Sequence, residues 1–146
     1  MRYWDTSVLL KLYVQESDSA RFAALLAQPG EVIYTSEFSR LELLRAFWGK
    51  RVDGAIRAGA ERALLRRFDQ EVELGRITLV SQRAEAWKQF EAVLETCYKR
   101  AQPVRVRAFD ALHLATALAA KATEIVCTDT RMRAGAALLG LRLFPL

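Results

Sequence analysis

Hydrophobic and polar positions follow two alternating patterns along the chain. Short runs rich in aromatic and β-branched residues predict strands, whereas apolar residues three and four positions apart predict amphipathic helices. For example, Phe38, Leu41 and Leu44 mark the apolar side of a helix that Thr35 or Ser36 can cap. The pattern predicts five strands, at residues 2–5, 31–35, 76–80, 124–128 and 141–144, and seven helices, at 7–14, 18–28, 36–50, from the break at 53–54 to 73, 83–100, 107–121 and 131–139.

Strands that alternate with helices predict an α/β fold in which helices cover both faces of a parallel sheet. The 146 residues are the length of one ordinary domain, and neither a linker nor an internal repeat interrupts them. Residues 1–146 are therefore predicted to form a single domain. Right-handed crossovers place the carboxyl ends of all strands at one edge of such a sheet, and ligands bind outside that edge.

Composition narrows the possible classes of protein. With 52% hydrophobic and 27% charged residues the chain is not disordered, and it has no apolar run long enough to cross a membrane. Asp5 and Lys11 interrupt the first apolar stretch, so no secretory signal is predicted and a cytoplasmic location is expected. Two cysteines and one histidine exclude a disulfide framework and a multi-histidine zinc site. Any metal must be held mainly by carboxylates, which suits Mg²⁺ or Mn²⁺.

Positive charge is concentrated in the second half of the chain. Residues 1–73 carry 11 basic and 11 acidic side chains, whereas residues 74–146 carry 11 basic and 6 acidic ones, which gives the net charge of +5. Between Lys99 and Arg107 there are four basic residues and no acidic one. Arginine suits bidentate contacts to phosphate, so the pattern indicates either a phosphate-rich partner or a solvated basic surface.

Two aspartates follow predicted strands. Asp5 ends the first strand and Asp129 follows the fourth. If the sheet is parallel, both carboxylates lie at the same edge. The alternative for each is a purely structural role as the N-cap of the next helix.

Asp110 lies in the most apolar predicted helix, one turn before His113. A buried carboxylate is costly unless it is paired or binds a cation, so Asp110 either binds a metal or pairs with Arg105 or Arg107. His113 fits a packed, hydrogen-bonded role better than that of a ligand. Glu42 borders the apolar side of its helix, where a solvated glutamate is equally compatible with the pattern.

Carboxylates that gather at one edge repel each other, and a divalent ion removes that conflict. The ion can also lower the pKa of bound water and stabilise a displaced phosphate oxygen. Beside an arginine-rich surface, such a cluster indicates metal-dependent cleavage of phosphodiester bonds.

Four segments, in this order along the chain, carry a family resemblance: Met1-Arg-Tyr-Trp-Asp-Thr-Ser-Val-Leu-Leu-Lys-Leu-Tyr, Ser36-Glu-Phe-Ser-Arg-Leu-Glu-Leu, Arg107-Ala-Phe-Asp-Ala-Leu-His-Leu-Ala-Thr-Ala and Thr128-Asp-Thr-Arg-Met. Together they resemble PIN-domain ribonucleases, in particular the VapC toxins of bacterial and archaeal toxin–antitoxin pairs. The resemblance covers nearly the whole chain, and its most specific segment begins at Asp110.

The resemblance implies a three-layer fold with a five-stranded parallel sheet of order 3-2-1-4-5, and cleavage of RNA that depends on Mg²⁺ or Mn²⁺. It also implies a homodimer and a VapB-like antitoxin whose C-terminal segment occupies the active-site groove. The catalytic acids of the family correspond to Asp5, Glu42, Asp110 and Asp129. Of these, Asp5, Asp110 and Asp129 would bind the metal, and Glu42 would act as a ligand or orient the attacking water.

Further roles are expected around these acids. Ser7 corresponds to the hydroxyl that supports the first acid, and Thr128 and His113 are additional supporting residues. The expected contacts to the RNA backbone come from Arg105, Arg107 and Arg131.

The sequence departs from the family at two positions. Cys127 stands where relatives often have threonine, and Arg131 stands where some relatives have a further acid, which affects the second metal position. The alternatives are a catalytically weak binding module of the same fold and a small-molecule phosphatase. Trp4, Trp48 and Trp87 add to a high apolar content, which favours a surface that contacts another chain.

Overall fold

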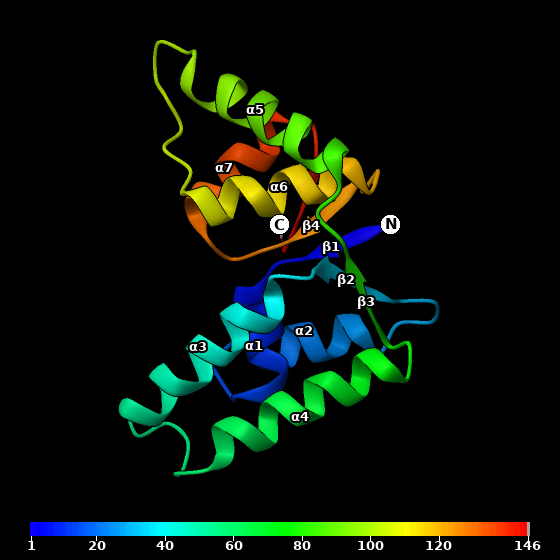
Figure 1. Cartoon of the computed structure of the whole chain (residues 1–146), viewed down its shortest axis with the longest axis vertical. Helices are drawn as coiled ribbons and strands as arrows, with labels where there is room; N and C mark the ends of the chain where they lie inside the picture. The colour runs from blue at the N-terminus through cyan, green and yellow to red at the C-terminus, as the bar shows by residue number, and fades with distance from the viewer. Residues whose placement is uncertain (146) are drawn as a thin grey trace.

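The computed structural model describes residues 1–145 and contains the predicted alternation of strands and helices (Figure 1). The strands are β1 (Arg2–Trp4), β2 (Ile33–Ser36), β3 (Ile77–Val80), β4 (Glu124–Val126) and β5 (Arg142–Phe144). The helices are α1 (Thr6–Tyr13), α2 (Ser19–Leu26), α3 (Ser39–Val52), α4 (Ala60–Glu73), α5 (Ala84–Tyr98), α6 (Ala108–Ala119) and α7 (Thr130–Leu138).

The strands form one parallel sheet in the order β3-β2-β1-β4-β5, which confirms the predicted topology. Helices α1 to α4 lie on one side of the sheet and α5 to α7 on the other (Figure 1). Alternate side chains of β1 point to opposite faces of the sheet. Tyr3 packs into the apolar cluster around α5 to α7, and Trp4 packs into the cluster around α1 to α4. The short central strand is thus buried on both faces.

Helix α3 begins at Ser39, three residues later than the predicted start at Ser36. Ser36 instead continues β2, where it pairs with Val80 of β3. Its hydroxyl then accepts the backbone N–H of Phe38 at 3.1 Å, which forms the turn into the helix. The Ser36 hydroxyl, which the sequence suggested as a helix cap, therefore stabilises the turn before α3.

Trp4 does not contribute to a partner surface. Its side chain is completely buried, and its indole Nε1–H donates to Glu31 Oε1 at 3.0 Å. Trp48 and Trp87 are exposed, as a partner surface requires. Among residues 1–145, no helix combines the length and the apolar character needed to span a membrane.

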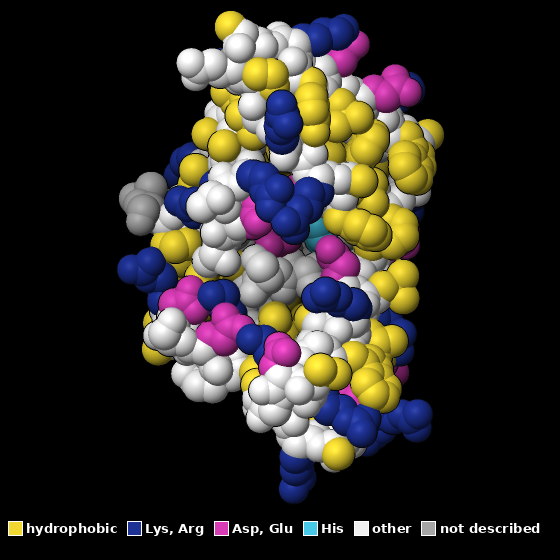
Figure 2. Space-filling view, turned by 90° about the vertical axis from the view of Figure 1, so that its left-hand side faces the viewer, with side chains coloured by type: hydrophobic (Ala, Val, Ile, Leu, Met, Phe, Trp, Pro, Cys, Tyr) yellow, Lys and Arg dark blue, Asp and Glu magenta, His cyan; other side chains and the backbone are white. Residues whose placement is uncertain are grey.

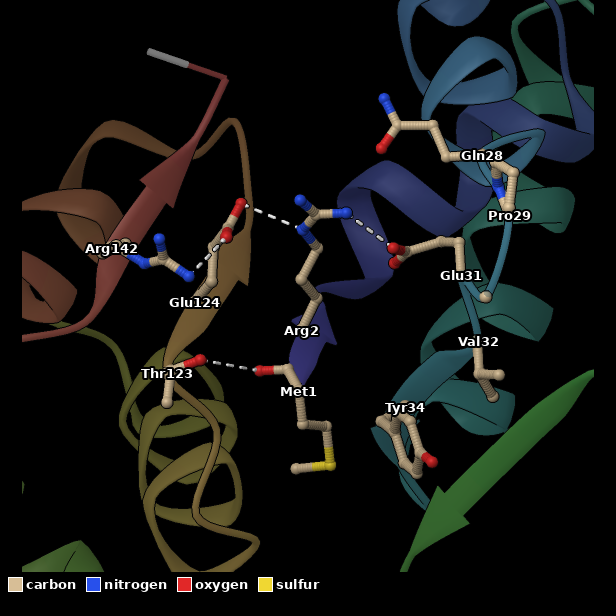
Figure 3. A pocket seen from close by; sticks show the side chains of 11 residues that line it. Met1, Arg2, Gln28, Pro29, Glu31, Val32, Tyr34, Thr123, Glu124 and Arg142 are labelled. Carbon is tan, nitrogen blue, oxygen red and sulfur yellow. Dashed lines mark hydrogen bonds and ion pairs between the residues drawn. The ribbon is translucent and has the colours of Figure 1, made fainter.

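A hollow of about 460 Å³ at the amino edge of the sheet contains a chain of ion pairs (Figure 3). Arg2 Nη1 lies 2.6 Å from Glu31 Oε2, and Arg2 Nε lies 3.1 Å from Glu124 Oε1. Arg142 Nη2 reaches Glu124 Oε2 at 3.4 Å. These paired charges connect the beginnings of β1, β4 and β5 to the segment before β2, so this hollow has a structural role.

Replacing Arg2 by methionine should lower the free energy of unfolding by about 1–3 kcal/mol, because two poorly hydrated carboxylates lose their partner. The side chains of Glu31 and Glu124 are only 8% and 10% exposed. Urea denaturation measures the change. Arg142→Met is the matched control and should cost less than about 1 kcal/mol, since a mostly exposed arginine contributes little. Equal losses in the two variants would contradict the assigned role of Arg2.

Candidate active site

A cleft of about 810 Å³ opens at the carboxyl edge of the sheet, on the side opposite the paired charges. The starts of α1 and α6 and one side of α3 contribute its walls. Figure 2 shows acidic side chains near the middle of this face, with Lys and Arg side chains above and below them and hydrophobic side chains beside them. Its polar lining consists of Asp5, Thr6, Ser7, Glu42, Arg45, Arg107, Asp110, His113 and Asp129.

Asp5 connects β1 to α1 and is the N-cap of that helix. Its Oδ2 accepts the backbone N–H of Ser7 at 3.2 Å and also the Ser7 hydroxyl. Its Oδ1 lies 3.8 Å from His113 Nε2. Burial raises the pKa of Asp5, with Glu42 adding to the effect, although His113 and the hydrogen bonds from Ser7 oppose it. A cation beside Asp5 would favour the ionised carboxylate.

Asp129 holds the equivalent position after β4, as the N-cap of α7. Its Oδ1 accepts the backbone N–H groups of Arg131 and Met132 at 3.0 and 2.9 Å. The N-cap alternative is thus correct for both Asp5 and Asp129. It does not exclude a second role, because Asp129 Oδ2 has no hydrogen bond to the described part of the chain.

Asp110 lies in the first turn of α6, and its Oδ2 accepts the backbone N–H of Arg107 at 2.9 Å. The predicted alternative, an ion pair with Arg105 or Arg107, is wrong within residues 1–145, because no salt bridge involves Asp110 there. The unpaired N–H groups at the helix start replace the expected guanidinium. As in Asp129, one carboxylate oxygen is held by backbone and the other accepts no hydrogen bond from the described residues.

Glu42 and His113 form a pair across the cleft, in which His113 is buried and Glu42 is partly exposed. His113 Nε2 lies 2.6 Å from Glu42 Oε2, and Nδ1 lies 2.7 Å from the hydroxyl of Tyr3. Burial alone would lower the pKa of His113, but the hydrogen bond to Glu42 and the carboxylates of Asp5 and Glu42 raise it. In Glu42 the effect of burial is outweighed by the hydrogen bond and charge of His113, which lower its pKa. These interactions favour the protonated form of His113, in which both ring nitrogens can donate hydrogen bonds.

Sequence reasoning missed two residues of the cleft. The Thr6 hydroxyl donates to Glu42 Oε2 at 2.6 Å and lies 3.0 Å from Ser39 Oγ, so it joins α1 to α3. Arg45 follows Glu42 by three positions on α3 and lines the same cleft. A helical spacing of three from a candidate acid is the signal that could have identified Arg45.

Of the remaining candidates, Ser7 and Arg107 line the cleft, and Thr128, Arg105 and Arg131 lie outside its lining. Ser7 Oγ is 3.4 Å from Thr128 Oγ1, which places Thr128 behind Asp5. Arg107 lines the cleft, whereas Arg105 and Arg131 are exposed residues outside its lining. The three predicted basic residues are thus divided between the cleft and its surroundings.

The donors present agree in kind with a hard divalent ion. Asp5, Asp110 and Asp129 each have one oxygen fixed at a helix start and a second one without a close hydrogen bond to residues 1–145. Oxygen ligands of this type suit Mg²⁺ or Mn²⁺. Within residues 1–145, however, no three His, Cys, Asp or Glu side chains are grouped closely enough to hold an ion as they stand. Binding would require these side chains to draw together.

Residues 2–138 match the family model described as PIN domain. The chain belongs to the PIN domain family. This membership accounts for the parallel sheet, its strand order and the position of the cleft at the carboxyl edge.

Two solved structures share the fold of this PIN domain. VapBC2 from Rickettsia felis, bound to a DNA fragment from their promoter, aligns with a TM-score of 0.68 and 15% identity over 98% of this chain and 97% of the other. FitAcB from Neisseria gonorrhoeae aligns with a TM-score of 0.69 and 16% identity over 99% and 96%. No curated protein gives a significant match to the sequence.

The His113 pair should make the stability of this PIN domain depend on pH. Because the folded pKa of His113 is above its ordinary value of 6.5, the stabilisation is complete below 6.5 and is lost as pH rises through the folded pKa. Urea denaturation in EDTA should show a falling free energy of unfolding over this range. In His113→Gln this component should disappear; an unchanged pH slope in the variant would contradict the assignment.

Proposed function

We propose that this PIN domain is a metal-dependent endoribonuclease that acts as the toxin of a toxin–antitoxin pair. The observation that carries the proposal is the arrangement of Asp5, Asp110 and Asp129 around one cleft, each with one oxygen fixed by a helix start. Membership of the PIN domain family and the resemblance to VapC toxins support it.

Each acid has a defined part in the proposed reaction. Asp5, Asp110 and Asp129 would hold Mg²⁺ or Mn²⁺, which would supply positive charge for the scissile phosphate and for bound water. Ser7, with Thr128 behind it, keeps the Asp5 carboxylate in place. Glu42 is fixed by Thr6 and His113, and orients the attacking water toward the phosphate.

Arginines provide the proposed contacts to the RNA backbone. Arg107, the N-cap of α6, and Arg45 on α3 line the cleft. No ion pair or side-chain hydrogen bond to the described residues engages either guanidinium. Arg105 and Arg131 extend this positive charge outside the cleft. Phosphate contacts of this kind make binding fall with salt concentration.

The proposed partners are a VapB-like antitoxin and a second copy of the chain. The fold shared with VapBC2 and FitAcB supports the antitoxin. The exposed apolar residues Leu41, Trp48 and Val52 on α3 offer a surface for a homodimer.

The test is incubation of the purified protein with total cellular RNA, with Mg²⁺, with Mn²⁺ or with EDTA, followed by mapping of fragment ends. Cleavage at defined positions is expected with either ion and none in EDTA. Undiminished cleavage in EDTA would refute the metal mechanism. Absence of cleavage with both ions would favour the alternative, a catalytically weak binding module.

A further inference from the structure

An exposed aromatic ring lies at the opening of the cleft. Phe109, which directly precedes Asp110, lines the cleft although 51% of its surface is exposed. Ligand clefts are commonly lined by aromatic side chains, whereas a single exposed apolar residue on an open surface needs no explanation. The position beside a proposed metal ligand makes Phe109 a candidate for contact with the substrate.

A second ring, that of Phe38, packs against Phe109. Phe38, at the start of α3, lies edge-to-face with Phe109, with the ring centroids 6.3 Å apart and the planes at 83°. Edge-to-face contact stabilises the orientation of both rings. Phe109 is thus partly fixed before any ligand binds.

Charges on both walls indicate what kind of molecule the ring meets. Arg107, the N-cap of α6, lies two residues before Phe109, and Arg45 on α3 also lines the cleft. Neither guanidinium has an ion-pair partner among residues 1–145. Unpaired guanidinium groups attract phosphate, and a neighbouring exposed ring stacks on bases. An apolar protein segment would use the ring but would leave both arginines without partners.

We infer that Phe109 is a stacking platform for an unpaired base next to the scissile phosphate. This inference rests on the proposed function and assigns to one residue the contact with the base. In a duplex, the base faces are covered by neighbouring pairs and cannot reach the ring. The arginines contact the backbone whatever the sequence, whereas Phe109 requires a base that can stack.

The test compares wild type with Phe109→Leu and Phe109→Trp, and uses Trp87→Leu as the matched control. Trp87 is exposed to a similar degree, 53%, but lies on α5 outside the cleft lining. Fluorescence anisotropy with Ca²⁺ in place of Mg²⁺ measures binding of a short unstructured RNA, the same strand made of abasic nucleotides, and the RNA duplex.

Phe109→Leu should weaken binding of the unstructured RNA by about 10-fold, which is within the range for loss of one stacked base. Phe109→Trp and Trp87→Leu should bind it as wild type does. The abasic strand should bind wild type and Phe109→Leu equally, and the duplex should bind wild type more weakly than the single strand. Equal affinity of wild type and Phe109→Leu for the normal strand, or the same loss on the abasic strand, would overturn the inference.

Cleavage by the wild type in Mg²⁺, measured with the same strands, separates this inference from the proposed function. Metal-dependent cleavage with no effect of Phe109→Leu on affinity refutes the platform alone. If the wild type neither binds nor cleaves RNA, both the inference and the proposed function are refuted. If Phe109→Leu is unfolded by circular dichroism, the wild-type comparison of normal, abasic and duplex strands still decides, since equal affinity for all three overturns the inference.

Discussion

Replacing Asp110 by asparagine should reduce metal-dependent cleavage at least about 100-fold while the protein remains folded. Asparagine keeps the shape of the side chain and an oxygen that can accept the backbone N–H of Arg107, so the start of α6 is preserved. The substitution removes the negative charge that the proposed ion requires. Because it also removes a carboxylate from a crowded cleft, the melting temperature in EDTA should stay equal or rise slightly.

The measurements are initial cleavage rates in Mg²⁺ and thermal melting of the same preparations. Asp53→Asn is the matched control, since Asp53 is an exposed aspartate at the end of α3, away from the cleft. It should leave both quantities unchanged. A variant at Asp110 that melts early yet cleaves at the normal rate per folded molecule would assign Asp110 a structural role only.

Replacing His113 by leucine should destabilise the fold by about 3–5 kcal/mol, which corresponds to a fall in melting temperature of roughly 10 °C. Leucine fills a similar volume but donates no hydrogen bond. The carboxylate of Glu42 and the hydroxyl of Tyr3 then lose their shared partner. Asp5 and Glu42 are also left facing each other without the intervening positive charge.

Urea denaturation in EDTA at neutral pH tests this effect without bound metal. Tyr3→Phe provides the graded comparison, because it removes one of the two hydrogen bonds and keeps the imidazolium, at a cost of about 1–2 kcal/mol. If His113→Leu is no less stable than Tyr3→Phe, the charge of the imidazolium does not contribute to holding the cleft together.

The elements and the shared edge of the first and fourth strands could be predicted from local pattern, whereas the order of strands in the sheet was implied by the family resemblance. Apolar runs and helical spacing define the elements, and parallel connections place Asp5 and Asp129 at one edge. The N-cap role of each aspartate followed from the same local information.

The contacts of His113 could not be predicted in this way. Its partners, Tyr3 and Glu42, are distant along the chain and lie on different elements, so no spacing rule connects them. The alternative ion pair of Asp110 with Arg105 or Arg107 is absent from the described residues for the opposite reason, because the backbone N–H of Arg107 at its own helix start occupies one carboxylate oxygen. The contacts of His113 depend on the packing of distant elements, whereas the hydrogen bond of Asp110 depends on the local geometry of its helix start.

The central position of β1 determines how much of the chain must be synthesised before the cleft is complete. β1 pairs with β4, and every element from α1 to α6 lies between these two strands along the chain. Until β4 is synthesised, one side of β1 has no partner strand, and Asp129 is not yet present beside Asp5. A ribosome-bound chain that lacks β4 therefore carries an open sheet edge and an incomplete set of acids. The proposed nuclease would stay inactive toward the RNA around it until β4 and Asp129 had been synthesised.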